Sequence, residues 1–194
     1  MQQEKVKIAL EKFSKNVIKQ ARQNLTKKSH NDTKAGYDSL KYDLNVSKNS
    51  FGLEFFMLDY MEFQDKGVKG KTSTYSSASK SPFKFGKSAG KPRQSGGLYD
   101  SIEKWVSRKG IKGRDNGYTK KDGTKVKGTG RFITNKSLAS IIANSIYNKG
   151  LKGSMFFTRP FEQNYKKLPD ELIEAFGLDL DNLLKLETNG NNIR

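Results

Sequence analysis

Four carboxylates lie close together in the chain, at Glu54, Asp59, Glu62 and Asp65. Clustered carboxylates can hold divalent cations, and a two-metal nuclease would use such a set. Their neighbours favour an ordinary interpretation, because Glu54 lies on the polar side of a predicted hairpin. The other three lie at turns beside lysines, where solvated or paired acids are common. Catalysis by these acids is therefore not expected.

Other residues that build common catalytic sites are scarce. Cysteine is absent, and the only histidine, His30, lies in a polar stretch that we interpret as an exposed connection between elements. The sequence contains no phosphate-binding glycine loop and no nucleophile elbow. We therefore predict that the protein is not an enzyme, and that it has no catalytic residue, metal site or cofactor.

The net charge of +17 is concentrated in two windows of the sequence. Residues 66–99 contain eight basic residues and no acidic one, and residues 108–131 contain nine basic and two acidic residues, so the windows carry +15. Both are rich in Gly, Ser and Thr, which is typical of long loops. The candidate partner-contact residues are Lys66, Lys69, Lys71, Lys80, Lys84, Lys87, Lys91, Arg93, Arg108, Lys109, Lys112, Arg114, Lys120, Lys121, Lys125, Lys127 and Arg131.

Aromatic residues are interleaved with these bases, at Tyr75, Phe83, Phe85, Tyr118 and Phe132. Such a surface can follow a phosphate backbone and stack on its bases, which favours a nucleic-acid-binding protein. No recognised nucleic-acid-binding module accompanies the windows, however. Basic Gly-Ser loops also bind acidic neighbours or thread between subunits, and become ordered on assembly. Composition leaves both interpretations open.

Apolar periodicity predicts the elements that position these windows. A stripe with spacings of three and four predicts a helix from about Gln3 to Thr26. Alternating apolar residues on both sides of a polar turn predict a hairpin over residues 40–57. Shorter helices are expected near residues 98–106 and 138–146, and further helices after Pro160 and Pro169.

The expected fold class is α+β, with the long N-terminal helix packed on a small antiparallel β-sheet, further C-terminal helices and two long basic loops. We predict a single domain over residues 1–187. Its extended basic loops would span residues 66–97 and 108–133, and a polar tail would span residues 188–194.

A Lys-Gly-aliphatic-Lys-Gly pentapeptide occurs at residues 66–70, 109–113 and 149–153. Glycine after a helix relieves the penalty of the left-handed backbone conformation, and lysine is favourable at the negative end of the helix dipole. The segments before the copies differ from one another, so no repeated fold unit is predicted. The three copies are predicted to mark the places where ordered elements end.

The composition is that of a polar chain, with 34% hydrophobic residues and a mean hydropathy of −0.80. No run of about 18 apolar residues occurs, and the first residues begin a helical pattern in place of a signal peptide. We expect a soluble protein that is made in a cytoplasm and does not contact a membrane.

Two motifs give the chain a family resemblance. The first reads Tyr60-Met61-Glu62-Phe63-Gln64-Asp65-Lys66-Gly67, and the second reads Phe156-Phe157-Thr158-Arg159-Pro160-Phe161, ahead of a helix that opens at Leu168-Pro169. Preceded by a long helix and a hairpin, this order resembles that of the tail-completion, or head-tail joining, proteins of tailed bacteriophages. The two basic windows are longer than expected for that family.

The resemblance implies a structural virion protein that forms a homo-oligomeric ring, a hexamer or dodecamer, at the neck of the particle around the DNA channel. It implies assembly in the bacterial host cytoplasm, and as partners other copies of the chain, the portal, head-completion and tail proteins, and packaged DNA. A tail terminator subunit is a further alternative. The structural anchors would be Tyr60, Phe63, Gly67, Phe156, Phe157, Pro160 and Phe161.

Overall fold

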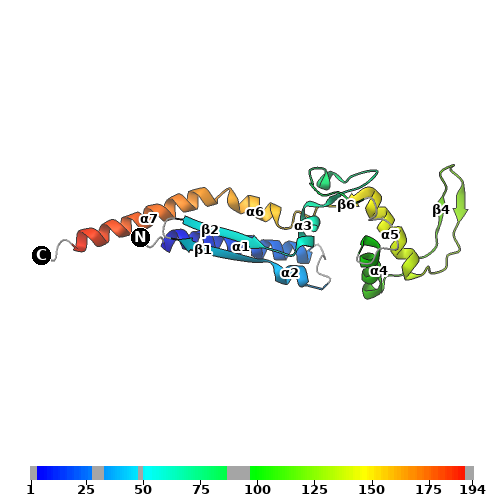
Figure 1. The fold of residues 1–194 in the computed structure, drawn as a ribbon, viewed down its shortest axis with the longest axis horizontal. Coiled ribbons are helices and arrows are strands. Elements are labelled where there is room, and N and C mark those ends of the chain that lie inside the picture. The colour runs from blue at the N-terminus through cyan, green and yellow to red at the C-terminus, as the bar shows by residue number, and fades with distance from the viewer. Residues whose placement is uncertain (1–3, 28–32, 48–49, 87–96, 191–194) are drawn as a thin grey trace. The chain divides into compact units, whose positions relative to one another are not determined.

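The computed structural model describes residues 4–27, 33–47, 50–86 and 97–190, without the side chains of residues 183, 184 and 186–190. Packing divides the chain into two compact units (Figure 1): unit 1 is Met1–Asp65 with Ser154–Arg194, and unit 2 is Lys66–Gly153. The sequence predicted one domain with two extended loops. In the structure both basic windows belong to unit 2, which is inserted into the sequence of unit 1 and has helices of its own.

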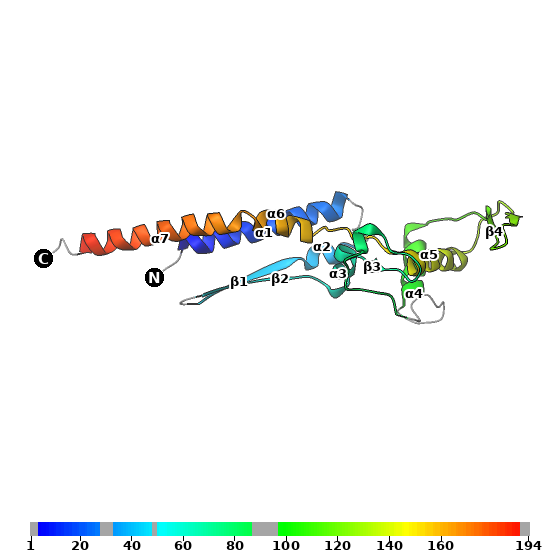
Figure 2. The ribbon, with the colours of Figure 1, turned by 90° about the horizontal axis from the view of Figure 1, so that it is seen from above.

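Unit 1 is built on two long helices, α1 (Glu4–Lys27) and α7 (Leu168–Gly190), which lie side by side in both views (Figures 1 and 2). The short helices α2 (Ala35–Ser39), α3 (Asp59–Lys66) and α6 (Thr158–Tyr165) complete its helical elements. The predicted apolar stripe of α1 is buried along its whole length: Val6, Leu10, Phe13, Val17, Ala21 and Leu25. The N-terminal helix is therefore confirmed over the described residues.

The strands β1 (Lys41–Ser47) and β2 (Ser50–Phe56) form the predicted antiparallel hairpin, with Leu44 opposite Leu53. Successive side chains of a strand point to opposite faces, so Leu44, Leu53 and Phe55 pack together against the core that α1 and α7 share. In the described residues Phe56 and the nearby Leu58 stay 49% and 42% exposed.

The Phe-Phe-Thr-Arg-Pro-Phe segment links the helices to the hairpin. The ring of Phe161 lies 5.8 Å from that of Phe13 on α1, and the ring of Phe157 lies 5.4 Å from that of Phe55 on β2. Both pairs have the edge-to-face geometry that favours aromatic contacts. Phe156 is completely buried in a neighbouring cluster. This segment therefore fixes the start of α6 inside the core of unit 1.

Unit 2 contains α4 (Leu98–Lys109), α5 (Asn135–Lys149), a 3-10 turn (Ser76–Ala78) and the strands β3 (Val68–Lys69), β4 (Gly117–Thr119), β5 (Lys125–Lys127) and β6 (Gly150–Leu151). The helix α4 packs against α5, and the buried residues there are Val106, Ala139 and Ala143. The sequence did not predict the antiparallel hairpin that β4 and β5 form inside the second basic window. That window therefore has regular structure.

Each pentapeptide lies where an ordered element ends, as predicted, and in all three cases that element is a helix. Gly67, Gly110 and Gly150 directly follow α3, α4 and α5, and their φ angles are 76°, 61° and 85°. The structure adds a relation that the sequence did not predict, because the first and third copies pair as β3 and β6, with Val68 opposite Leu151. This short ladder joins the first and last residues of unit 2, and so closes the insertion at its base.

The C-terminal region also differs from its prediction in one detail. The helix α7 is continuous to Gly190, whereas the polar tail was expected to begin at residue 188. Residues 191–194 lie outside the described part of the chain, and so does His30.

Candidate partner-binding surfaces

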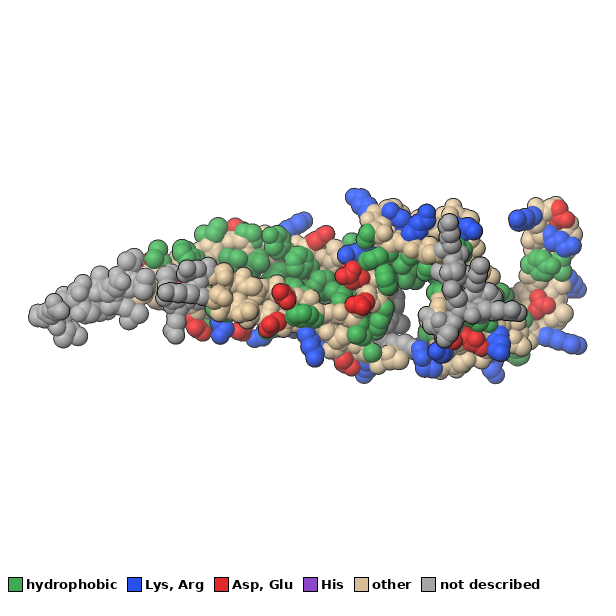
Figure 3. All heavy atoms as spheres, in the orientation of Figure 1, with side chains coloured by type: hydrophobic (Ala, Val, Ile, Leu, Met, Phe, Trp, Pro, Cys, Tyr) green, Lys and Arg blue, Asp and Glu red, His purple; other side chains and the backbone are tan. Residues whose placement is uncertain are grey.

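The whole net charge of the chain lies in unit 2. Residues 66–153 contain 21 lysines and arginines against four acidic residues, a net charge of +17, whereas the rest of the chain contains 16 basic and 16 acidic residues. In Figure 3, lysine and arginine side chains project from the β4–β5 hairpin. The electrostatic boundary coincides with the boundary of the packing units, so a strongly acidic partner is attracted to unit 2.

Several aromatic rings of unit 2 lie beneath cations of the same unit. The pairs, with the distance from cation to ring centre, are Lys66–Phe83 (5.8 Å), Lys152–Tyr75 (4.9 Å), Lys71–Tyr147 (5.7 Å) and Arg114–Phe132 (4.4 Å). A cation over a ring face is attracted by the quadrupole of the ring. Three rings that were predicted to stack on bases therefore already have a cation partner. Tyr118, on β4, is 64% exposed.

The β4–β5 hairpin presents the most regular basic surface. Its two acids hold its turns, because Asp115 accepts hydrogen bonds from the backbone N–H groups of Thr129 and Gly117, both at 3.0 Å. These bonds lower the pKa of Asp115 below its ordinary value, and the bond from the Thr124 N–H (2.9 Å) does the same for Asp122. The lysines are exposed around these turns: Lys120, Lys121, Lys125 and Lys127.

The structure gathers some of the predicted contact residues and not others. Arg114 and Arg131 flank the hairpin, and Arg108 and Lys109 end α4. The described bases of the first window lie at the end of α3, on β3 and in the segment after β3: Lys66, Lys69, Lys71, Lys80 and Lys84. Lys87, Lys91 and Arg93 lie outside the described residues. The hairpin is therefore the best-defined part of the predicted surface.

The four clustered carboxylates, Glu54, Asp59, Glu62 and Asp65, do not form a metal site in the described structure. Asp65 is buried, with 3% exposure, and its carboxylate accepts hydrogen bonds from the Phe157 N–H (2.8 Å), the Thr158 N–H and the Thr158 hydroxyl. It thereby caps the N-terminus of α6 from a distant part of the sequence. In the described residues no group of three His, Asp or Glu side chains could hold a metal ion.

Two of the predicted structural anchors are not in the core. Tyr60 and Phe63 lie on α3 with 48% and 42% of their surface exposed. They are one helical turn apart, and α3 buries Met61 and Asp65 in their place. Together with Phe56 and Leu58 they form an exposed group that we call the α3 patch. Its apolar side chains are accompanied by the exposed acids Asp59 and Glu62.

The other anchors are enclosed. Phe156 and Pro160 are buried, and Phe157 and Phe161 pack against the α1–α7 core. Gly67 lies against the backbone of the last pentapeptide, where an added Cβ atom would meet the Gly153 nitrogen at 2.5 Å. The motif at residues 60–67 therefore begins with the exposed rings of Tyr60 and Phe63. It ends at the buried Gly67, where no side chain fits.

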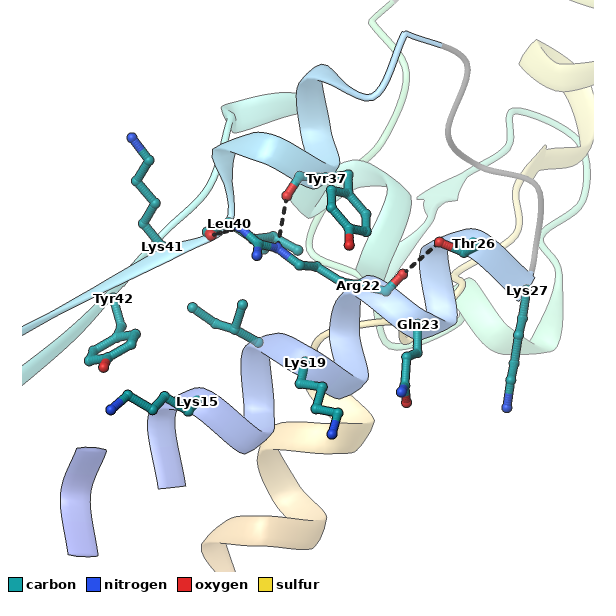
Figure 4. A pocket seen from close by; sticks show the side chains of 11 residues that line it. Lys15, Lys19, Arg22, Gln23, Thr26, Lys27, Tyr37, Leu40, Lys41 and Tyr42 are labelled. Carbon is teal, nitrogen blue, oxygen red and sulfur yellow. Dashed lines mark hydrogen bonds between the residues drawn. The ribbon is translucent and has the colours of Figure 1, made fainter. Parts of the chain in front are cut away.

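A basic groove in unit 1 was not predicted. It lies between the second half of α1 and the segment that joins α2 to β1, with a volume of about 910 Å³ (Figure 4). Its floor is partly apolar, with Ile18, Leu40, Tyr37 and Tyr42, and its cations are Lys15, Lys19, Arg22, Lys27 and Lys41. None of the described side chains that line it is acidic.

The cations of this groove differ in how firmly they are held. Arg22 donates to the backbone carbonyls of Tyr37 (3.2 Å) and Leu40 (3.0 Å), with its guanidinium 5.0 Å from the Tyr37 ring centre (Figure 4). The hydrogen bond to Glu11 raises the pKa of Lys15 above its ordinary value. Within the described part of the chain, the ammonium groups of Lys19 and Lys41 have no hydrogen-bond or ion-pair partner.

A signal for the groove was present in the sequence. Lys15, Lys19 and Arg22 recur at spacings of four and three, which places them on one face of the predicted helix. The missing information was the position of α2 and β1, whose residues lie far from Lys15 in sequence.

Comparison with known proteins does not identify a relative of this chain. No family model, curated protein or solved structure matches the chain. Among the described helices, none combines the length and the apolar character that crossing a membrane requires.

Proposed function

We propose that the chain is a structural subunit of a tailed-bacteriophage virion, a neck or tail-completion protein that forms a ring at the head-tail joint around the DNA channel. Unit 1 would build the ring, and unit 2 would present its positive charge to packaged DNA or to an acidic neighbouring protein. The observation that carries the proposal is the confinement of the whole net charge to one inserted unit.

Unit 1 has the properties of a subunit that is completed by neighbours. Its charges balance, and its exposed α3 patch places Phe56, Leu58, Tyr60 and Phe63 in contact with water. Contiguous exposed apolar side chains rimmed by polar groups mark interaction sites. Repeated heterologous contacts between identical subunits close into a ring when the rotation between them allows it.

Unit 2 has the properties of a surface for a polyanion. Its lysines gather on a hairpin whose acids are held in turns, and Tyr118 beside them is exposed. Lysines that neutralise phosphates release counterions, so binding is strong at low salt and weakens steeply as salt rises. A neck subunit that surrounds DNA needs this kind of contact, because sequence-independent electrostatic binding does not depend on which bases pass.

The test is the location of the chain in particles. Virions purified from cells that carry the gene are analysed by mass spectrometry and by averaged cryo-electron microscopy of the head-tail joint. The proposal expects several copies in a ring at the neck. A ring at the far end of the tail tube would instead support a tail terminator, and intact virions that lack the chain would overturn both assignments.

A second candidate is a nucleic-acid-binding protein outside any virion, which the exposed lysines and Tyr118 of the β4–β5 hairpin favour. Gel-shift titrations of DNA at several salt concentrations test it. Replacing Lys120, Lys121, Lys125 and Lys127 by glutamine should lower the salt slope by roughly 0.9 for each phosphate that the protein no longer neutralises. The matched control is Lys136→Gln with Lys149→Gln on α5. Binding without steep salt dependence would exclude this candidate.

A further inference from the structure

The outward face of α7 lacks a partner within the described residues of unit 1. Its inward face packs on α1 through Leu168, Leu172 and Ala175. Ile173, Phe176 and Leu180 recur at spacings of three and four along the flank of that packed face, and are 72%, 48% and 40% exposed. A helix that is apolar on two faces is completed by packing on both of them.

Acidic residues accompany this exposed stripe. Asp170, Glu174 and Asp181 share a neighbouring helical row, and all three side chains are exposed. The surface of α7 that faces away from α1 is therefore both apolar and acidic. It has the chemistry that fits a groove with an apolar floor and a basic rim.

The basic groove of unit 1 is such a surface. Lys19 and Lys41 lie at its rim without a partner in the described chain, and Ile18, Leu40 and the two tyrosines supply its floor. The α3 patch is a poorer match, because the acids Asp59 and Glu62 among its apolar side chains would repel the acids of α7. Charge complementarity therefore favours the basic groove over the α3 patch as the docking site for α7.

The helix α7 is directed away from the groove of its own chain. Lys12 pairs with Glu171 at 3.9 Å, and the N–H groups of Lys5 and Val6 donate to Asp179, so α7 runs antiparallel to α1. Residues after Asp179 extend beyond the first turn of α1, while the groove lies along the last turns of α1. Only another copy can bring the outward face of α7 to the groove.

We propose that α7 of one copy docks, by its acidic and apolar face, into the basic groove of the next copy. The contact is heterologous, since two different surfaces meet, and repetition of it propagates around a ring. This inference rests on the ring assembly proposed above, and it names the interface. The residues that carry it are Lys19 and Lys41 on one side, and Glu174, Phe176 and Asp181 on the other.

Charge reversal tests the interface. The groove variant carries Lys19→Glu and Lys41→Glu, and the helix variant carries Glu174→Lys and Asp181→Lys. Molar mass is measured by light scattering and by sedimentation over a range of protein and salt concentrations. Each variant should associate about 10- to 100-fold more weakly than the wild type, because like charges then face one another. The combined four-residue variant should recover a large part of the loss.

Mixing the two variants tests whether the groove of one copy pairs with α7 of another. The groove variant still carries an intact α7, and the helix variant still carries an intact groove. In an equimolar mixture the native α7 of the groove variant meets the native groove of the helix variant, and the reversed α7 of the helix variant meets the reversed groove of the groove variant. Both contacts pair opposite charges, so the mixture should assemble more strongly than either variant does alone. Lys136→Glu with Lys149→Glu, exposed residues of α5 outside the groove, is the matched control and should assemble as the wild type does. Circular dichroism confirms that every variant is folded.

The outcomes separate this inference from the proposed function. Equal assembly of the wild type and both reversed variants, or a wild type that remains monomeric at high concentration, overturns the docking of α7. Loss of DNA binding in the groove variant with unchanged assembly also overturns it, and would assign the groove to a polyanion. If the chain is absent from virions and the reversal pattern still holds, the virion function fails and the interface stands.

Discussion

The two units of this chain are stabilised in different ways. Unit 1 has balanced charge and buries large side chains, among them Phe13, Leu25, Met61 and Phe156. In the described residues of unit 2 the buried hydrophobic side chains are smaller: Val68, Ala78, Val106, Ala139 and Ala143. Burial of apolar area is the main favourable term in folding, so unit 1 has the stronger source of stability.

The distribution of charge further lowers the expected stability of unit 2 relative to unit 1. A net charge of +17 within 88 residues, numbers 66–153, repels itself and disfavours a compact state. Unit 2 offsets part of this cost with cations placed over aromatic rings, with acids fixed in the turns of its hairpin, and with the β3–β6 ladder. A polyanionic partner would remove most of the repulsion. The comparison indicates that unit 1 is stabilised mainly by apolar burial, whereas unit 2 carries an excess charge that its own contacts offset only in part.

The largest expected effect is on unit 1. Phe156→Ala removes a completely buried ring and should lower the free energy of unfolding by about 3–5 kcal/mol. Phe132→Ala is the matched control in unit 2, where the ring is 60% exposed, and should cost less than about 1 kcal/mol. Urea unfolding is followed by circular dichroism for the whole chain and by fluorescence of Trp105, the only tryptophan, which lies in unit 2.

Circular dichroism and Trp105 fluorescence together show whether the two units also differ in their free energy of unfolding. Phe156→Ala should move the circular-dichroism transition more than the Trp105 transition. Coincident shifts of both probes would show that the units unfold together, and the comparison would then hold for composition and charge only.

The sequence predicted the parts of this contrast that depend on local pattern. The stripe from Val6 to Leu25 identified α1, because a repeat of three and four residues can only be buried by a helix against one partner surface. Alternation identified the β1–β2 hairpin, and the glycines of the pentapeptides identified three places where ordered elements end. The location of the positive charge is a property of the sequence itself.

Features that depend on distant residues could not be predicted in this way. Asp65 appeared to be a surface acid, since nothing near it in sequence shows that its partners are Phe157 and Thr158. The pairing of Val68 with Leu151 joins two pentapeptides that each look like an isolated helix end. Tyr60 and Phe63 were expected as structural anchors from the family resemblance, which does not specify the face of α3 that is buried.

The second prediction concerns the distant cap of α6. Asp65→Asn keeps the shape of the side chain and removes its charge, so the N–H groups of Phe157 and Thr158 lose an ionised acceptor. We expect a loss of about 1–3 kcal/mol in the free energy of unfolding, measured by urea titration. Asp122→Asn, at an exposed turn of unit 2, should change it by less than about 0.5 kcal/mol. Equal effects would show that burial does not distinguish the two carboxylates.

The third prediction concerns the base of unit 2. Gly67 and Gly110 both have positive φ, but an added Cβ atom at Gly67 would meet the Gly153 nitrogen at 2.5 Å, and at Gly110 it meets nothing within 4 Å. Gly110→Ala should cost about 1 kcal/mol, from the backbone alone. Gly67→Ala should cost clearly more, because the β3–β6 ladder must shift. Thermal unfolding followed by Trp105 fluorescence compares them, and similar shifts would mean that the ladder contributes little.

The smallest expected effect is the pH dependence of the β4–β5 hairpin. Bonds from the N–H groups of Thr129 and Gly117 lower the folded-state pKa of Asp115 below the ordinary 3.8. A carboxylate with a lowered folded pKa stabilises the folded state above its unfolded pKa, and this contribution is lost as pH falls through the folded pKa. The hairpin should therefore keep its order from neutral pH to about 4 and lose it below that.

The measurement is the amide signal of Thr129 by NMR. In Asp115→Asn the signal should no longer respond to this acidic range, whereas the core amides of α1, in unit 1, should be unchanged by that substitution. A hairpin that opens at the same pH in the variant would show that acid acts through other groups, and that the turns of unit 2 do not depend on this carboxylate.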